Sequence, residues 1–174
     1  MGKFAGISVG WLCAFDTVIM IGMFNFGYGM ASWNSLQTPF ALRHQWDEET
    51  ATYWATIVTT GMTVGGCIGA LTAGYMMSLA DKRTLILCSN ALLIAGSGLT
   101  LIDNMYLISV GRLLYGVAIG HFSVYCPCYM NDLVPPELKG PMAGITNIQV
   151  CLGILAPFIF GYWIPEKVQL EKDV

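Results

Sequence analysis

Residues 50–80 read TATYWATIVTTGMTVGGCIGALTAGYMMSLA and contain no Asp, Glu, Lys or Arg. A helix needs about 20 predominantly apolar residues to cross the hydrocarbon core of a bilayer, and this stretch is longer than that. Inside hydrocarbon a segment must satisfy its backbone hydrogen bonds internally, which a single helix does. The stretch therefore predicts a transmembrane helix near residues 53–77.

Four further stretches without these charged residues lie on either side of the first: 17–42, 84–102, 113–131 and 140–165. Each is long enough to hold one membrane-spanning helix. The sequence therefore predicts an all-α membrane protein with about five transmembrane helices. They form one bundle within residues 1–164, followed by a polar tail over residues 165–174. The spans are expected near 14–34, 53–77, 84–102, 107–130 and 141–164.

The composition also favours a membrane location. The chain is 55% hydrophobic and 11% charged, whereas soluble domains carry about 25% charged residues. Its net charge of −3 provides no basic surface for nucleic acid, so membrane lipid is the expected surrounding. The cysteines lack the spacing of metal ligands, and no nucleophile–base pair or phosphate-binding loop is present. We therefore expect no enzymatic activity, metal or cofactor.

The Lys and Arg residues outside the tail favour a cytoplasmic N-terminus. That orientation puts four tryptophans at the outer membrane–water interface, where such rings are enriched: Trp33, Trp46, Trp54 and Trp163. Asp16 then lies near the inner end of the first helix, where we expect it to cap the helix. His121 lies in the middle of the fourth span, where we expect it to form hydrogen bonds inside the bundle; a proton relay is the alternative.

Small residues recur at every fourth position in the second predicted span, at Gly61, Gly65 and Gly69, and again in the fourth span, at Gly116 and Gly120. This spacing lets two helix backbones approach closely, which is how helices gain contact in lipid. We expect these glycines to pack helices within one bundle. A motif for dimer formation is the alternative.

Several motifs follow one another along the chain. Phe26-Gly27-Tyr28 precedes Val64-Gly65-Gly66, and Gly111-Arg112-Leu113 opens the fourth predicted span. Residues 127–140 read PCYMNDLVPPELKG. This segment resembles the pattern P-x-Y-x-x-E-x-x-P-x-x-L-R-G, which follows the fourth helix in sugar porters. The chain is therefore similar to the N-terminal half of the sugar porter family in the major facilitator superfamily, and most of all to the facilitative glucose transporters.

The resemblance implies a cytoplasmic gate, in which a basic cluster after the second helix pairs with an acid after the fourth. The residues implied in this charge network are Lys82, Arg83, Arg112, Asp132 and Lys139. Asp132 stands where the family has Glu, and Lys139 stands where it has Arg. Both keep the sign of the charge while losing reach or bidentate geometry. The loop over residues 78–83 departs further, because it lacks the family's first arginine and its turn glycine.

The resemblance also implies a sugar site. Asn147 stands where the family carries a substrate-contacting glutamine, and Asn25, Asn34 and Gln149 are further amides that can bind hydroxyl groups. Hydrogen bonds between helices are the alternative use of each of these amides. Gly29 follows the Phe-Gly-Tyr motif at the position where the proton-coupled branch of the family usually has an aspartate. The resemblance therefore favours facilitated diffusion.

Two functions follow from a chain that resembles half of a major facilitator. In the first, it is a truncated half-transporter that moves a hexose only with a complementary half, because alternating access requires two halves that rock against each other. In the second, it is a non-transporting accessory subunit that packs against other membrane proteins in a larger complex, for which an energy-transducing organelle membrane is a suitable place. The sequence does not distinguish a plasma membrane from an organelle inner membrane.

Overall fold

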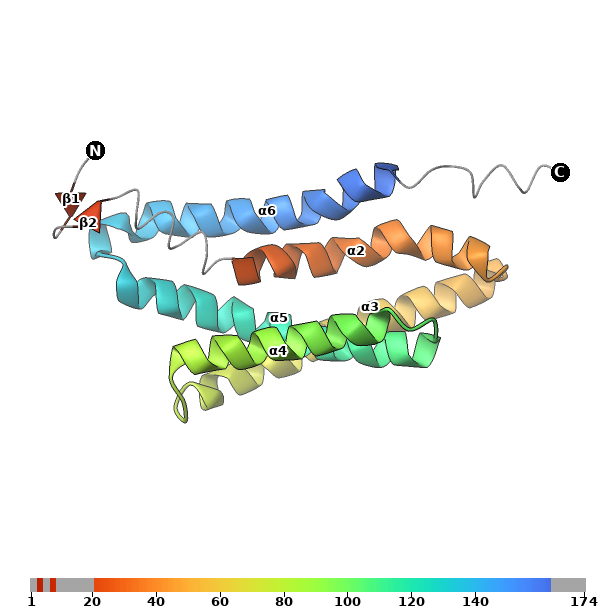
Figure 1. Ribbon diagram of the computed structural model, residues 1–174, viewed down its shortest axis with the longest axis horizontal. Coiled ribbons are helices and arrows are strands. Elements are labelled where there is room, and N and C mark those ends of the chain that lie inside the picture. Colours follow the sequence, from red (N-terminus) through yellow and green to blue (C-terminus); the bar gives the residue numbers. More distant parts are fainter. Residues whose placement is uncertain (1–2, 5–6, 9–20, 164–174) are drawn as a thin grey trace.

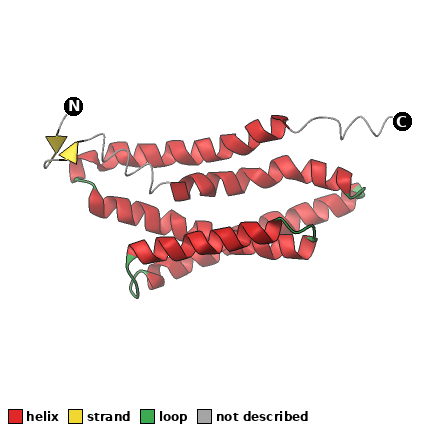
Figure 2. Cartoon of the chain, in the orientation of Figure 1, coloured by secondary structure: helices red, strands yellow, loops and turns green. Residues whose placement is uncertain are grey.

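The computed structural model describes residues 3–4, 7–8 and 21–163. A two-residue antiparallel strand pair comes first, and five α-helices and one 3-10 turn follow (Figures 1 and 2). The elements are β1 (Lys3–Phe4), β2 (Ile7–Ser8), α2 (Ile21–Arg43), α3 (Glu48–Met76), α4 (Lys82–Thr100), α5 (Met105–Leu133), η1 (Pro136–Leu138) and α6 (Lys139–Trp163). The predicted all-α membrane fold is confirmed by this helical bundle.

Four stretches of the described chain are long and apolar enough to cross a membrane: α3, α4, α5, and α6 together with the preceding η1 turn. The predicted span at 14–34 corresponds to α2, which continues past residue 34 and ends at Arg43. Asp16 and the rest of that span before Ile21 lie outside the described residues, as does the polar tail at 165–174. Helices α3 to α6 each begin two to five residues before the predicted spans, because a helix can start outside the hydrocarbon core, while α3, α4 and α6 end one or two residues before the predicted limits.

Local sequence explains where the helices begin. Glu48 and Glu49 occupy the first turn of α3, where carboxylates interact favourably with the positive end of the helix dipole. Asn104 caps α5, because its side-chain oxygen accepts a hydrogen bond from the Tyr106 backbone nitrogen at 3.0 Å. Pro127 lies inside α5 without ending it. Packing by neighbouring helices makes such prolines tolerable in transmembrane helices.

The helices form two layers. Figure 1 shows α2 and α6 side by side in one layer, with α3, α4 and α5 in the other. Helix α5 is central, since it contacts α2, α3 and α4. Gly65 of α3 contacts Leu113 of α5, and four residues later Gly69 contacts Val117. Because the residue numbers increase together along both helices, α3 and α5 are parallel.

The other helix pairs show that successive helices alternate in direction. Helices α2 and α6 are also parallel, because Phe24 of α2 contacts Gly153 of α6 and, further along both helices, Ser35 contacts Gly161. Helix α4 is antiparallel to α5, because its first residue meets the last turn of α5. The bundle therefore has two ends. We name them the Lys82 end, where α4 begins, and the Asp103 end, where the loop between α4 and α5 lies.

Helices α3 and α5 meet backbone to backbone. A methyl group on Gly65 would lie 2.3 Å from the Leu113 carbonyl oxygen, and one on Gly116 would lie 2.2 Å from the Met62 carbonyl oxygen. Gly69 and Gly120 are equally crowded, with 2.2 and 2.3 Å to the nearest backbone oxygen. Gly61 differs, because its nearest atom across the interface lies at 3.8 Å, an ordinary contact distance. Four of the five predicted packing glycines thus lie in a single seam between two helices of the same chain.

The core follows α5. Phe122, Tyr125 and Cys126 are completely buried along this helix. Trp33 is only 6% exposed and packs against Val58 and Ile108. The expectation that Trp33 lies at the outer membrane interface is therefore wrong: the ring points into the bundle, where burial of its large apolar surface stabilises the fold. Trp46 and Trp54 are half-buried near the Asp103 end, and the Trp163 side chain lies outside the described part of the structure.

Candidate functional site

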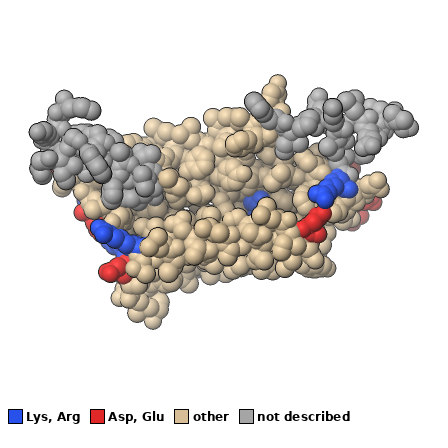
Figure 3. Space-filling view, viewed as in Figure 1, with Lys and Arg blue, Asp and Glu red and all other residues tan. Residues whose placement is uncertain are grey.

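On the face shown in Figure 3, charged side chains gather at the two ends of the bundle, and the surface between them is uncharged apart from one small basic patch near the middle. At the Lys82 end, the Lys82 ammonium forms an ion pair with the Asp132 carboxylate, which joins the start of α4 to the last turn of α5. Arg83 Nε donates a hydrogen bond to the Tyr129 hydroxyl at 2.8 Å. Tyr129 and Asp132 are three residues apart and share one face of α5, so consecutive residues of α4 bind both.

Two residues of the predicted charge network lie apart from this pair. Lys139 begins α6 at the same end of the bundle, but within the described chain no hydrogen bond or ion pair joins it to Lys82, Arg83 or Asp132. Arg112 is 20 residues before Asp132 on α5, a separation of about 30 Å along a helix. The prediction that Arg112 lies among the charged residues of the loops is therefore wrong. The gating role of the other four residues stays a prediction.

Arg112 instead lies inside the bundle, where it is 8% exposed. Its Nη1 donates to the Gly29 carbonyl oxygen and to the Ser32 hydroxyl, both at 3.1 Å. The guanidinium also lies over the Trp33 ring, 5.5 Å from its centroid, and Nη1 is 3.9 Å from the Met62 sulfur. Arg112 therefore joins α5 to α2 and α3. Among the described residues, no carboxylate forms an ion pair with it.

A tyrosine one helical turn along strengthens the same junction. The Tyr115 hydroxyl donates to the Asn25 carbonyl oxygen at 2.8 Å, so α5 binds the backbone of α2 at two levels. The sequence motif around Arg112 indicated an important arginine but not its partners. One of its partners in α2, the Gly29 carbonyl oxygen, is a backbone group that no side-chain pattern could have revealed. Ser32, three residues after Gly29, was the available signal and was missed.

The four amides predicted to contact a sugar do not point to one place. Asn25 and Asn34 are nine residues apart on α2, which places them on opposite sides of the helix at about 100° per residue. Asn147 and Gln149 are two residues apart on α6, and accordingly Asn147 is exposed whereas Gln149 is buried. The side chain of Asn25 donates to the Ile21 carbonyl oxygen of its own helix at 3.1 Å. Their role in sugar binding stays a prediction.

His121 joins three helices. Its Nε2 lies 3.2 Å from the Thr72 hydroxyl of α3, its Nδ1 lies 3.3 Å from the Ser89 hydroxyl of α4, and its ring stacks on Tyr125. Both ring nitrogens therefore have hydroxyl partners, which can donate or accept according to the tautomer. This arrangement agrees with the expected hydrogen bonds inside the bundle.

The chain resembles known sugar transporters over most of its length. The model of the family described as "Sugar (and other) transporter" matches residues 15–171. Among relatives, the bovine "Solute carrier family 2, facilitated glucose transporter member 8" is 29% identical over 144 residues, which cover 82% of this chain and 29% of the relative. "Plastidic glucose transporter 4" of Arabidopsis thaliana is 30% identical over 161 residues, which cover 90% of this chain and 28% of the relative.

A solved structure supports the fold. The chain superposes on a "D-xylose-proton symporter" with a TM-score of 0.67 at 21% identity, covering 87% of this chain and 40% of that protein. At this identity the likeness concerns the fold alone. The chain spans less than a third of the length of these two curated relatives. Its apolar helices and the family match show an integral, multi-pass membrane protein, and the chain belongs to the sugar (and other) transporter family.

Proposed function

We propose that this chain supplies one helical half of a hexose carrier and transports by facilitated diffusion when a second helical half completes it. The relatives named above are glucose transporters, and the chain covers less than a third of each. In major facilitators two halves rock around a site at their interface, near the bilayer midplane. A single half provides only one wall of such a site.

The observation that carries the proposal is a polar groove between α2 and α3. The groove has a volume of about 710 Å³ and is lined by Gln37 and Thr38 of α2 and by Thr52, Thr56, Thr59 and Thr60 of α3, among others. Thr52 and Thr56 donate to carbonyl oxygens of their own helix at 2.8 Å, and the other hydroxyl and amide groups of this lining are costly in hydrocarbon unless they too are paired. A partner with its own polar side chains would satisfy this face, which lipid tails would not.

Arg112 supports facilitated diffusion over proton coupling. The resemblance places Gly29 where the proton-coupled branch usually carries an aspartate, and here Arg112 binds the Gly29 carbonyl oxygen instead. A backbone carbonyl does not take up a proton between pH 5 and 8, so this contact offers no titratable partner. A proton gradient would then have no direct action at this junction.

The experiment is reconstitution of the chain into liposomes, alone and together with the second half of a relative, followed by uptake of a labelled hexose. We expect saturable uptake only with both halves, and no change when a protonophore collapses the proton gradient. Asn147→Ala should reduce uptake, whereas Asn131→Ala, an exposed asparagine at the Lys82 end, should not. Uptake no greater than in protein-free vesicles would count against transport.

An accessory subunit is the second candidate, and the altered loop at residues 78–83 favours it, since a protein that does not gate has no need of the family's basic signature. This role predicts that the chain co-purifies with a membrane assembly in fixed stoichiometry. A single monodisperse species in mild detergent would contradict it. Gly65→Leu should disturb assembly under both candidates, because Gly65 lies in the seam between α3 and α5.

A further inference from the structure

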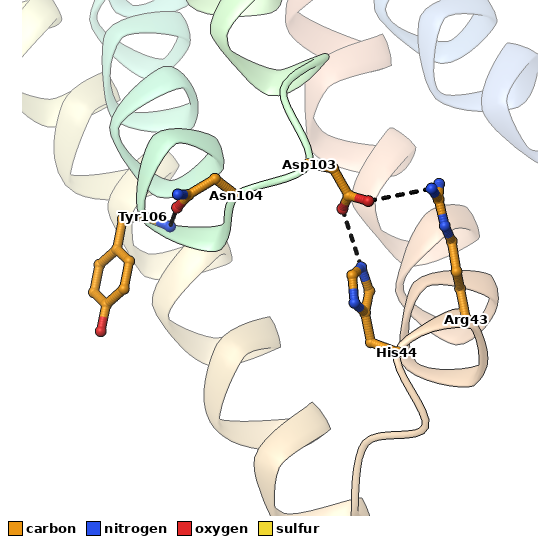
Figure 4. A network of polar contacts seen from close by, with 5 residues as sticks. All are labelled: Arg43, His44, Asp103, Asn104 and Tyr106. Carbon is orange, nitrogen blue, oxygen red and sulfur yellow. Dashed lines mark hydrogen bonds and ion pairs between the residues drawn. The ribbon is translucent and has the colours of Figure 1, made fainter.

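At the Asp103 end, two consecutive side chains from the end of α2 reach one carboxylate in the loop between α4 and α5 (Figure 4). His44 Nε2 lies 3.0 Å from Asp103 Oδ1, and Arg43 Nη2 lies 3.2 Å from Asp103 Oδ2. Asn104, the next residue in the loop, caps α5. Asp103 therefore joins the corner between α2 and α3 to the corner between α4 and α5.

The His44 ring is part of a cluster of three rings with Phe40 and Trp46, whose own centroids lie 6.3 Å apart. Its centroid lies 5.2 Å from that of Phe40 and 5.4 Å from that of Trp46, with interplanar angles of 28° and 22°. The imidazole thus stacks beside two rings that also contact each other, and its Nε2 meets the Asp103 carboxylate. The His44 side chain is still 32% exposed and that of Asp103 is 41% exposed, so protons from water reach both.

Protonation of His44 would strengthen its contact with Asp103. A neutral imidazole whose proton is on Nε2 donates one hydrogen bond to Asp103. An imidazolium forms a charge-assisted hydrogen bond to the same oxygen. It also presents a cation to the faces of Phe40 and Trp46, an attractive interaction that the neutral ring lacks. Histidine is the side chain that ordinarily changes charge between pH 5 and 8.

We propose that His44 is a proton-binding latch: when it takes up a proton, it ties the end of α2 to the α4–α5 loop, and when it releases the proton the two corners separate more readily. The latch lies at the opposite end of the bundle from the Lys82–Asp132 pair. It is a device for setting the mobility of the Asp103 end by pH, and it is independent of the proposed transport function.

Other charges at this end act on the latch. Arg43 shares the Asp103 carboxylate and opposes a second cation beside it, which limits how far protonation tightens the contact. The titratable groups at the starts of the adjoining helices are Asp47, Glu48 and Glu49 at α3 and Tyr106 at α5. Within the described chain, none of these four forms a hydrogen bond or ion pair with His44.

Hydrogen exchange on the full chain in detergent micelles tests the latch. Exchange is measured for peptides covering residues 40–47 and 100–105 at about pH 5.5 and about pH 8, and corrected for the intrinsic pH dependence of exchange. We expect protection to be roughly fivefold higher at the lower pH, the size of an exposed ion pair plus a cation–aromatic contact. His44→Gln keeps a side-chain donor without the titration and should show equal protection at both pH values. Asp103→Asn removes the carboxylate, so only the smaller response from the His44 contacts with Phe40 and Trp46 should remain.

The matched control is Glu49→Gln, which removes an exposed acid at the same end and should keep the wild-type pH response. The chain has two histidines, so nuclear magnetic resonance of labelled histidine in the unsubstituted protein provides a second measurement. The His44 signal should titrate together with the change in protection. Unchanged wild-type protection between the two pH values, or a pH response that survives in His44→Gln, would overturn the proposal.

Discussion

Replacing Gly65 by Ala tests whether the seam between α3 and α5 holds the bundle together. The new methyl carbon would lie 2.3 Å from the Leu113 carbonyl oxygen, whereas ordinary contact begins at 3.4 Å, so the helices must separate by about 3.4 − 2.3 = 1.1 Å at this point. Such a shift also opens the contacts of Gly69, Gly116 and Gly120. Overpacking costs about 1–3 kcal/mol, and the better helix propensity of Ala returns about 1 kcal/mol. Because four contacts open together, we expect a net loss near the upper limit, about 2 kcal/mol.

Gly74→Ala is the matched control in the same helix, because no atom lies within 4 Å of a methyl group there. It should leave stability unchanged or raise it by up to about 1 kcal/mol. Both variants are unfolded in detergent micelles by heat and by added denaturing detergent, followed by circular dichroism. A loss of about 2 kcal/mol corresponds to roughly 4–8 °C in Tm for a chain of this size. Equal stability of Gly65→Ala and Gly74→Ala would refute the close approach of the two helices.

Three further predictions concern the polar contacts. A double-mutant cycle on Lys82→Ala and Asp132→Ala, measured by unfolding, should give a small favourable coupling energy that decreases with salt, because the pair is exposed to solvent. Arg112→Lys should destabilise the bundle by about 2–4 kcal/mol in the same assay, since Lys keeps the charge but loses the planar contact with Trp33 and the fixed geometry of the donors to Gly29 and Ser32. Tyr115→Phe should cost about 1 kcal/mol, the value of one hydrogen bond to a backbone carbonyl.

The fold could be predicted from the sequence because the bilayer imposes a length on every apolar stretch. Glycines at every fourth position likewise predicted a close helix pair, and the structure places Gly65 and Gly116 in one seam. The site was harder to predict. The contact between Lys82 and Asp132 could be predicted, because the two residues carry opposite charges and follow predicted spans that end at the same side of the bundle. Arg112 was not, because charge alone does not say whether an arginine lies in a loop or points inward to backbone oxygens.

The strengths of these contacts indicate where the bundle can move. The middle is held by the glycine seam and by Arg112, whose buried bonds would leave unpaired groups if broken, at about 1–3 kcal/mol for each group. The two ends are held by solvent-exposed ion pairs, at Lys82 and at Asp103, which contribute little to stability because water and salt screen them. Motion will therefore begin at the ends, while α2, α3 and α5 stay together. A half that rocks as one body needs such a rigid middle, and contacts at its ends that break at low cost are the ones that a partner or a proton can switch.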